Sequence, residues 1–268
     1  MSGKTGATRV GCTDALRFTF GTLTALPVHL TRWDRPTARA GMACAPLAGL
    51  AIGLAAALVG ATAVLLGAAP LLAAVATTAV PAVLTRGLHL DGLADTADGL
   101  GSAKPADAAL AIMKRSDIGP FGVITLLFVL LAQVAALAQL YERGWAHAAT
   151  GAVLAAVTAR CALTLATRHG VPAARPEGLG AAVAEVLSTR AVLLVGALVT
   201  VVCAGAGALA YGGAPGALHG AVAALLGLTA AELLLRHCGR RFGGVTGDVF
   251  GALAETAGTV ALVALALG

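Results

Sequence analysis

Long apolar stretches separated by short polar segments dominate the sequence. No charged residue occurs between Arg39 and Arg86, a gap that is too long for one membrane span of about 20 residues and suits two, broken near residues 67–70. Five further apolar runs each have about the length that a bilayer needs: 118–141, 146–167, 191–211, 215–235 and 249–268. The pattern predicts an all-α, polytopic transmembrane helical bundle of about seven spans with short external turns, forming one integral membrane domain over residues 1–268. Residues 15–27 are also apolar, and we expect an interfacial or re-entrant helix there rather than a span.

Composition supports a membrane protein and excludes an ordinary soluble domain. Hydrophobic residues make up 58% of the chain and charged residues 12%, and the mean hydropathy is +0.88. Soluble domains carry about 25% charged residues. The five cysteines are scattered without a C-x-x-C spacing, which argues against a disulfide framework and a zinc site.

The charges predict an orientation in the membrane. With seven spans, all but two of the 18 basic residues, Arg143 and Arg160, fall on one side. Cytoplasmic loops carry the excess of Lys and Arg, so we expect a multi-pass protein of the inner (cytoplasmic) membrane with its N-terminus inside. This placement, in loops between apolar runs, argues against a nucleic-acid interface despite the net charge of +5. Three longer loops are then cytoplasmic: 86–117, 168–190 and 236–248.

The first of these loops carries a stripe of carboxylates. Asp91, Asp95 and Asp98 are spaced i, i+4, i+7, which places them within roughly 60° of one another on a helix. Oxygen ligands of this kind suit Mg²⁺ or Mn²⁺, which can also be shared with substrate phosphates. The alternative is a solvated acidic helix start, stabilised by the helix dipole. We expect His89 in the entering turn, beside the stripe.

Two further segments carry candidate chemistry. Asp248 follows a glycine-containing turn with Thr246 and Gly247, where backbone amides at a helix start can meet an anion, or where Thr246 and Asp248 simply cap the helix. Lys114, Arg115 and Asp117 suit a phosphate grip, or else a positive anchor before the next span.

Three strings give the chain a family resemblance. They are His89-Leu-Asp-Gly-Leu-Ala-Asp-Thr-Ala-Asp-Gly99, the segment 113–122, and Gly243-Gly-Val-Thr-Gly-Asp248. In this order they resemble the cobalamin synthase family of adenosylcobinamide-GDP ribazoletransferases, and the resemblance covers almost the whole chain. One departure is that Arg115 and Asp117 stand in exchanged order relative to the family pattern.

The resemblance implies an Mg²⁺-dependent membrane enzyme with adenosylcobinamide-GDP and α-ribazole as substrates and GMP as a product. It leads to the hypothesis that Asp91, Asp95, Asp98 and Asp248 hold the metal, and that His89 or one Asp accepts the proton of the attacking hydroxyl. The substrate phosphates are then expected beside a polar set: Lys114, Arg115, Asp117, Thr246 and Gly247.

Two other classes of function compete with this one. A cation transporter would use Arg160, Glu232 and Glu255 as intramembrane sites. A non-catalytic docking subunit would not need three carboxylates on one stripe. The sequence leaves open whether the protein forms a homo-oligomer.

Overall fold

The computed structural model describes residues 10–267, and every regular element in that part of the chain is an α-helix. Outside two isolated β-bridges, residues 10–267 contain no extended pairing. Lys4 and Arg9, counted above among the orienting charges, lie outside the described residues, as does Gly268 at the end of the last expected span. The all-α prediction is confirmed.

The number of candidate spans agrees with the sequence pattern. A seventh span is obtained if α4 (Pro70–Leu84) and α5 (Leu88–Gly101), which meet at 87°, are counted as one broken helix. The expected break between the first two spans is confirmed, because Gly67 has a φ of +89° between α3 and α4. Six single helices are long and apolar enough to cross a bilayer: α3 (Ala45–Leu65), α7 (Pro120–Arg143), α8 (Trp145–Ala166), α10 (Thr189–Tyr211), α11 (Gly213–Phe242) and α12 (Gly247–Ala266).

The helix α11 is longer than the pattern predicted. The sequence placed Arg236, Arg240 and Arg241 in a loop after residue 235, but the helix continues through all three to Phe242. Basic side chains near a helix C-terminus interact favourably with the helix dipole, and Gly243, with a φ of +79°, supplies the left-handed residue that ends the helix. The predicted loop boundary was wrong by about two turns.

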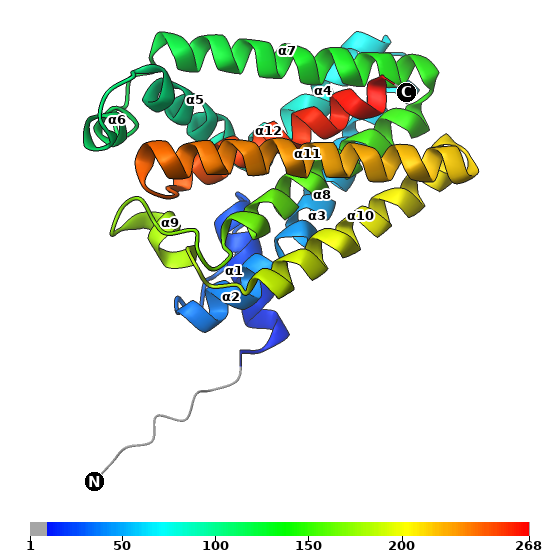
Figure 1. Ribbon diagram of the computed structural model, residues 1–268. Helices are drawn as coiled ribbons and strands as arrows, with labels where there is room; N and C mark the ends of the chain where they lie inside the picture. The colour runs from blue at the N-terminus through cyan, green and yellow to red at the C-terminus, as the bar shows by residue number, and fades with distance from the viewer. Residues whose placement is uncertain (1–9, 268) are drawn as a thin grey trace.

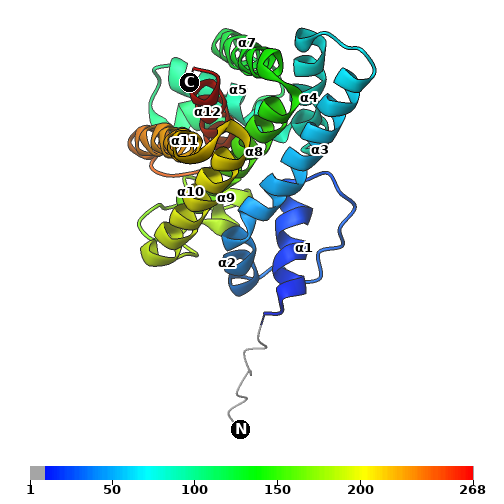
Figure 2. The ribbon, with the colours of Figure 1, turned by 90° about the vertical axis from the view of Figure 1, so that its right-hand side faces the viewer.

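The N-terminal segment forms two short helices beside the bundle, α1 (Cys12–Leu23) and α2 (Arg35–Ala43) (Figure 2). At 12 residues, α1 is about 18 Å long, too short to cross a membrane. The hydroxyl of Thr19 donates to the carbonyl of Gly41 at 2.7 Å and ties the two helices together. The prediction that residues 15–27 do not form a span is confirmed.

Small residues bring the central helices into backbone contact. The most enclosed span, α8, packs along α3, and a Cβ at Gly49 or Gly53 would meet the α8 backbone at Ala156 or Val153. Helices in lipid associate through such close packing, because lipid tails provide no hydrophobic driving force between them. The abundance of Gly and Ala therefore determines how tightly the bundle closes.

A cavity of about 70 Å³ inside the bundle is lined mainly by alanines and also by a few polar and charged side chains. Arg160 is 3% exposed, and its Nε and Nη2 have no hydrogen-bond partner among the described residues. Glu255 lines the same cavity and accepts a hydrogen bond from the amide of Gln133 at 2.9 Å. The two charges attract each other without a direct hydrogen bond between them.

One end of the bundle collects the short helices. In Figure 1, α5, α6 (Ala106–Ile112) and α9 (Gly178–Val183) gather at the left, where α7 begins and α11 ends. The opposite end consists of short turns between long helices. The polar segments that the sequence analysis singled out therefore meet at one end.

Replacing Gly49 by Ala should separate α3 from α8. The new methyl group would overlap the backbone of Ala156, so we expect a loss of about 1–3 kcal/mol in stability, measured as thermal unfolding in detergent. Gly196→Ala in α10 is the matched control, since nothing lies within 4 Å of its Cβ position. Equal shifts in Tm for the two variants would contradict close packing at Gly49.

Glu255→Gln should destabilise the bundle by leaving Arg160 without its nearby opposite charge. We expect a loss of about 2–4 kcal/mol, because an uncompensated charge would remain buried. The double variant Arg160→Leu, Glu255→Gln should lose less than the two single changes added together. Additive losses would show that the two charges do not interact.

Candidate active site

A sharp turn between α4 and α5 positions the acidic helix. Arg86 and Gly87 both have left-handed backbones, with φ of +55° and +71°. An L-residue such as Arg86 adopts this conformation at a cost of about 1–2 kcal/mol, so the turn is held by its surroundings. The amide of Asp91 donates to the carbonyl of Gly87 at 2.8 Å and begins the new helix.

The helix α5 crosses the ends of three spans. A Cβ on Gly92 would collide with the backbone of Asp248 in the first turn of α12. Further along, Gly99 packs against the ring of Phe242 at the end of α11, and Gly101 packs against Phe121 at the start of α7. The carboxylates of α5 therefore lie at the end of the bundle, beyond the 87° bend that separates α5 from α4 and outside the six single helices of span length.

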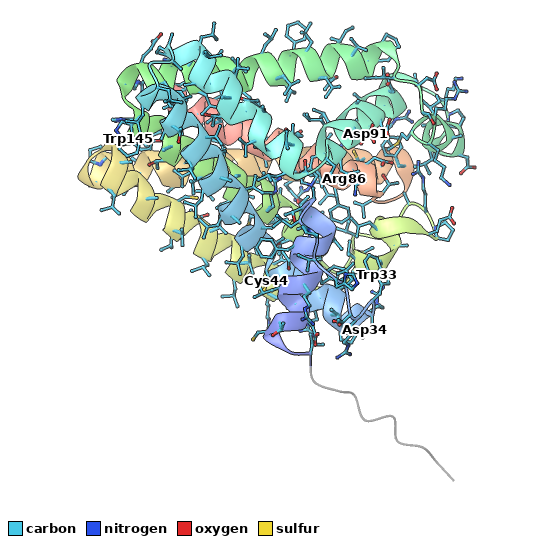
Figure 3. All side chains as sticks on the ribbon, turned by 180° about the vertical axis from the view of Figure 1, so that it is seen from behind. Trp33, Asp34, Cys44, Arg86, Asp91 and Trp145 are labelled. Atoms are coloured by element: carbon cyan, nitrogen blue, oxygen red, sulfur yellow. The ribbon has the colours of Figure 1, made fainter. Side chains whose placement is uncertain are left out.

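A cavity of about 670 Å³ opens beside α5, and Figure 3 shows two of its residues, Arg86 and Asp91, at the α4–α5 junction. Its size is that of a typical small-molecule site. Two carboxylates of the stripe line it together with the basic residues of the segment before α7. The charged and polar residues of its lining are Arg86, Asp91, Asp95, Lys114, Arg115, Ser116 and Asp117.

The predicted stripe is present, but its three members differ in environment. Asp91 is exposed, Asp95 is half-buried and Asp98 is buried. Burial, together with the negative charges of Asp91, Asp248 and Asp98, raises the pKa of Asp95 to about 7. Asp95 is therefore close enough to the other three carboxylates to be repelled by them, and a cation beside it would lower the energy of its charged form.

Asp98 has a structural role that the sequence did not reveal. Its two carboxylate oxygens accept hydrogen bonds from the backbone amides of Gly119 at 2.7 Å and Gly122 at 3.0 Å. These amides belong to the start of α7, whose first donors have no partner within their own helix. Asp98 thus holds the start of α7, which directly follows the segment that carries Lys114 and Arg115. Its role as a metal ligand stays a prediction.

His89 lies inside the bundle rather than on the cavity wall. It is 8% exposed, packs against Gly251 of α12, and has an Nδ1 without a hydrogen-bond partner among the described residues. Burial, with a contribution from the positive charge of Arg160, lowers the pKa of His89 well below its ordinary value. The hypothesis that His89 accepts the substrate proton gains no support from this placement.

The start of α12 is capped by its own residues. The Thr246 hydroxyl accepts from the amide of Val249 at 3.2 Å, so the capping alternative is confirmed for Thr246. Neither Thr246 nor Gly247, the first residue of α12, lines the large cavity. Their contact with substrate stays a prediction.

Arg175 is a site residue that the sequence analysis missed. It reaches from the loop between α8 and α9, donating from Nη1 to Asp248 at 3.2 Å and from Nη2 to the carbonyl of Leu110 at 2.7 Å. Its positive charge also lowers the pKa of Asp95, against the larger effect of burial. In the sequence it is one of many loop arginines, and no local pattern distinguishes it.

The basic side chains opposite the stripe are accessible. Lys114 and Arg115 are exposed on the cavity wall, and Lys114 makes an exposed ion pair with Glu177 at 3.2 Å. Such exposed pairs contribute at most about 1 kcal/mol, so Lys114 is easily drawn to another anion. Asp117 lines the same wall. The arrangement suits a ligand that carries several negative charges.

The side chains available as metal ligands suit Mg²⁺ better than a metal ion that must be enclosed by protein ligands alone. Within residues 10–267, no three His, Cys, Asp or Glu side chains are arranged to enclose one ion. Mg²⁺ is usually bound through one or two carboxylates, several waters and the substrate phosphates. Asp91 and Asp95 on one cavity wall supply such a pair.

Comparison with known proteins gives the family. The sequence model of the cobalamin-5-phosphate synthase family matches residues 15–266. A protein of Frankia casuarinae is 45% identical over 94% of both chains, and one of Nocardioides sp. is 39% identical over 94% of this chain and 98% of its own. A protein of Escherichia coli is 36% identical over 91% of this chain and 95% of its own. All three relatives are named adenosylcobinamide-GDP ribazoletransferase.

No solved structure matches the chain. The family match and the relatives each cover nine-tenths or more of the sequence, and the family match includes the acidic helix and the start of α12. The chain belongs to the cobalamin-5-phosphate synthase family.

Proposed function

We propose that this protein transfers the adenosylcobinamide phosphate group of adenosylcobinamide-GDP to α-ribazole, or to its 5′-phosphate, with release of GMP. The observation that carries the proposal is one cavity lined by both the carboxylates Asp91 and Asp95 and the basic side chains Lys114 and Arg115. The names of the relatives point to the same reaction.

The reaction requires little covalent participation by the protein. A ribose hydroxyl oxygen of the acceptor bonds to the phosphorus attached to cobinamide, and the bond from that phosphorus to the GMP oxygen breaks. GMP leaves with the electron pair, and the hydroxyl proton is lost. Phosphoryl transfer of this kind depends on positioning and on neutralising negative charge, which fixed charged groups can provide.

The basic wall is assigned to the diphosphate. Arg115 can bind two phosphate oxygens with its planar fork, and Lys114 adds a compact charge. Arg86 lines the same cavity and adds a third positive charge. Asp117 stands among these groups and can orient them.

Asp91 and Asp95 are assigned to hold Mg²⁺. Asp248, which pairs with Arg175 at 3.2 Å, lies near them on α12, and its role as a ligand stays a prediction. The repulsion among these carboxylates supports the assignment, since the pKa of Asp95 is raised partly by Asp91 and Asp248. When bound, Mg²⁺ neutralises the diphosphate and stabilises the charge that develops on the leaving group. The proton of the attacking hydroxyl goes to an α5 carboxylate, because these groups line the cavity and His89 does not.

The same charges assign the protein to the inner membrane with its acidic end in the cytoplasm. All described basic residues except Arg143 and Arg160 belong to the segments at the end that carries α5, α6 and α9, as the positive-inside rule expects of a cytoplasmic face. The transporter alternative is weaker, because Glu232 pairs with Arg168 at 2.8 Å and with Arg236 at 2.7 Å.

Asp91→Asn should abolish most of the GMP release by purified protein supplied with both substrates and Mg²⁺. We expect a loss of at least about 100-fold, as when one charge-stabilising group is removed from a transition state. Asp107→Asn is the matched control, because Asp107 is exposed on α6 and does not line the cavity. Lys114→Ala should raise the KM for the donor and leave the Mg²⁺ requirement unchanged. Equal activities of the two Asn variants would refute the carboxylate assignment.

Asp98→Asn should weaken the start of α7. The amide side chain keeps one acceptor oxygen but turns an N–H group towards the second backbone amide, so we expect about 1–2 kcal/mol of lost stability. Thermal unfolding measures this loss, and the Mg²⁺ concentration for half-maximal activity should stay unchanged. A rise in that concentration without a change in Tm would identify Asp98 as a metal ligand instead.

A further inference from the structure

The active-site cavity has an apolar wall whose residues have no role in the phosphoryl transfer itself. Leu88, Ile118 and Leu126 line it alongside the charged groups. Leu88 is 57% exposed and Ile118 is 51% exposed, so neither side chain is consumed in packing the bundle. An apolar surface of this kind inside a charged cavity calls for an apolar part of the ligand.

The wall extends from the end of the bundle into a span. Leu126 lies six residues after Pro120, the first residue of α7, which corresponds to about 9 Å along the helix. The helix α7 is a candidate span over its full length and runs from the end that carries α5 to the opposite end (Figure 1). Leu88 and Ile118 therefore lie beside the charged residues at the end of the bundle, and Leu126 extends the apolar lining into the candidate span.

The two substrates of the proposed reaction differ in what they can bring to this wall. The donor's diphosphate would lose its hydration against leucine side chains without gaining a partner, and the rim of its guanine is lined with polar groups that would be left unpaired there. The donor's corrinoid is far larger than this wall. The acceptor is a nucleoside whose base is a flat benzimidazole with two methyl groups, while its ribose is polar. A base of this kind gains from burial against aliphatic side chains.

We infer that Leu88, Ile118 and Leu126 bind the benzimidazole base of the acceptor nucleoside, so that its ribose faces Asp91 and Asp95. The inference rests on the proposed function and names the part of the acceptor that the apolar wall selects. The base then lies at the depth of the membrane-spanning part of α7, while the phosphates stay at the polar end.

Leu126→Thr tests the inference by adding a hydroxyl group to the wall. We expect the KM for α-ribazole to rise about 10-fold, as when a hydrophobic pocket loses its fit to one or two carbon atoms. The KM for adenosylcobinamide-GDP and the Mg²⁺ requirement should stay unchanged. Leu127→Thr is the matched control, because Leu127 is 55% exposed, does not line the cavity, and places the same hydroxyl at the same depth.

A comparison of two acceptors separates base binding from a general structural effect. Wild-type protein should prefer the dimethylbenzimidazole riboside to the benzimidazole riboside without methyl groups, and Leu126→Thr should reduce that preference. An unchanged preference, or an unchanged KM for α-ribazole, would overturn the inference. If a lipid chain occupies the wall, Leu126→Thr should change neither the preference nor the KM, and the inference would again be overturned.

Equilibrium binding of α-ribazole without donor distinguishes failure of the inference from failure of the proposed function. Wild-type protein that binds α-ribazole more tightly than Leu126→Thr, yet releases no GMP, would retain the inference and overturn the function. Normal GMP release with equal α-ribazole binding by both proteins would retain the proposed function and overturn the inference.

Discussion

The close crossing of α5 over α12 is the contact on which the site depends. At Gly92 the α5 backbone meets the backbone of Asp248, and at Gly251 the α12 backbone meets that of His89. Backbone contacts of this kind cannot relax by a change of rotamer, so they fix the two helices relative to each other. The left-handed turn at Arg86 and Gly87 directs α5 into this crossing, and the carboxylates of α5 arrive beside Asp248 as a consequence.

That placement concentrates negative charge, and the surrounding structure compensates for part of it. Arg175 pairs with Asp248, and two backbone amides satisfy Asp98. Asp91 and Asp95 have no comparable partner within the described chain and face the cavity. The carboxylates without a protein partner, Asp91 and Asp95, are therefore the ones that can bind a cation together with a phosphorylated substrate. In this way the folding of this end of the bundle determines its chemistry.

The sequence predicted the features that depend on local pattern. Apolar runs of span length, the break near residues 67–70 and the single stripe of Asp91, Asp95 and Asp98 follow from helix geometry and bilayer thickness alone. The extension of α11 past residue 235 was missed because basic residues were taken to mark a loop, although they also stabilise a helix C-terminus.

The features that depend on distant contacts could not be predicted. Asp98 is satisfied by amides 21 and 24 residues away, and Arg175 reaches a carboxylate 73 residues away. The burial of His89 follows from its packing against α12, which nothing in the segment 86–99 encodes. The sequence therefore identified which segments carry the chemistry, and the tertiary contacts decided which side chains face the cavity.

The most direct test of a metal shared between the α5 carboxylates and the diphosphate is Mn²⁺ binding followed by electron paramagnetic resonance. Adenosylcobinamide-GDP is added without α-ribazole, so no turnover occurs. Since coupling between two ligands is reciprocal, the donor should tighten Mn²⁺ binding to the wild-type protein, beyond the Mn²⁺ bound by donor alone, and Asp91→Asn should remove this effect. Mn²⁺ binding that is the same with and without donor, in protein that still releases GMP when α-ribazole is added, would contradict the account.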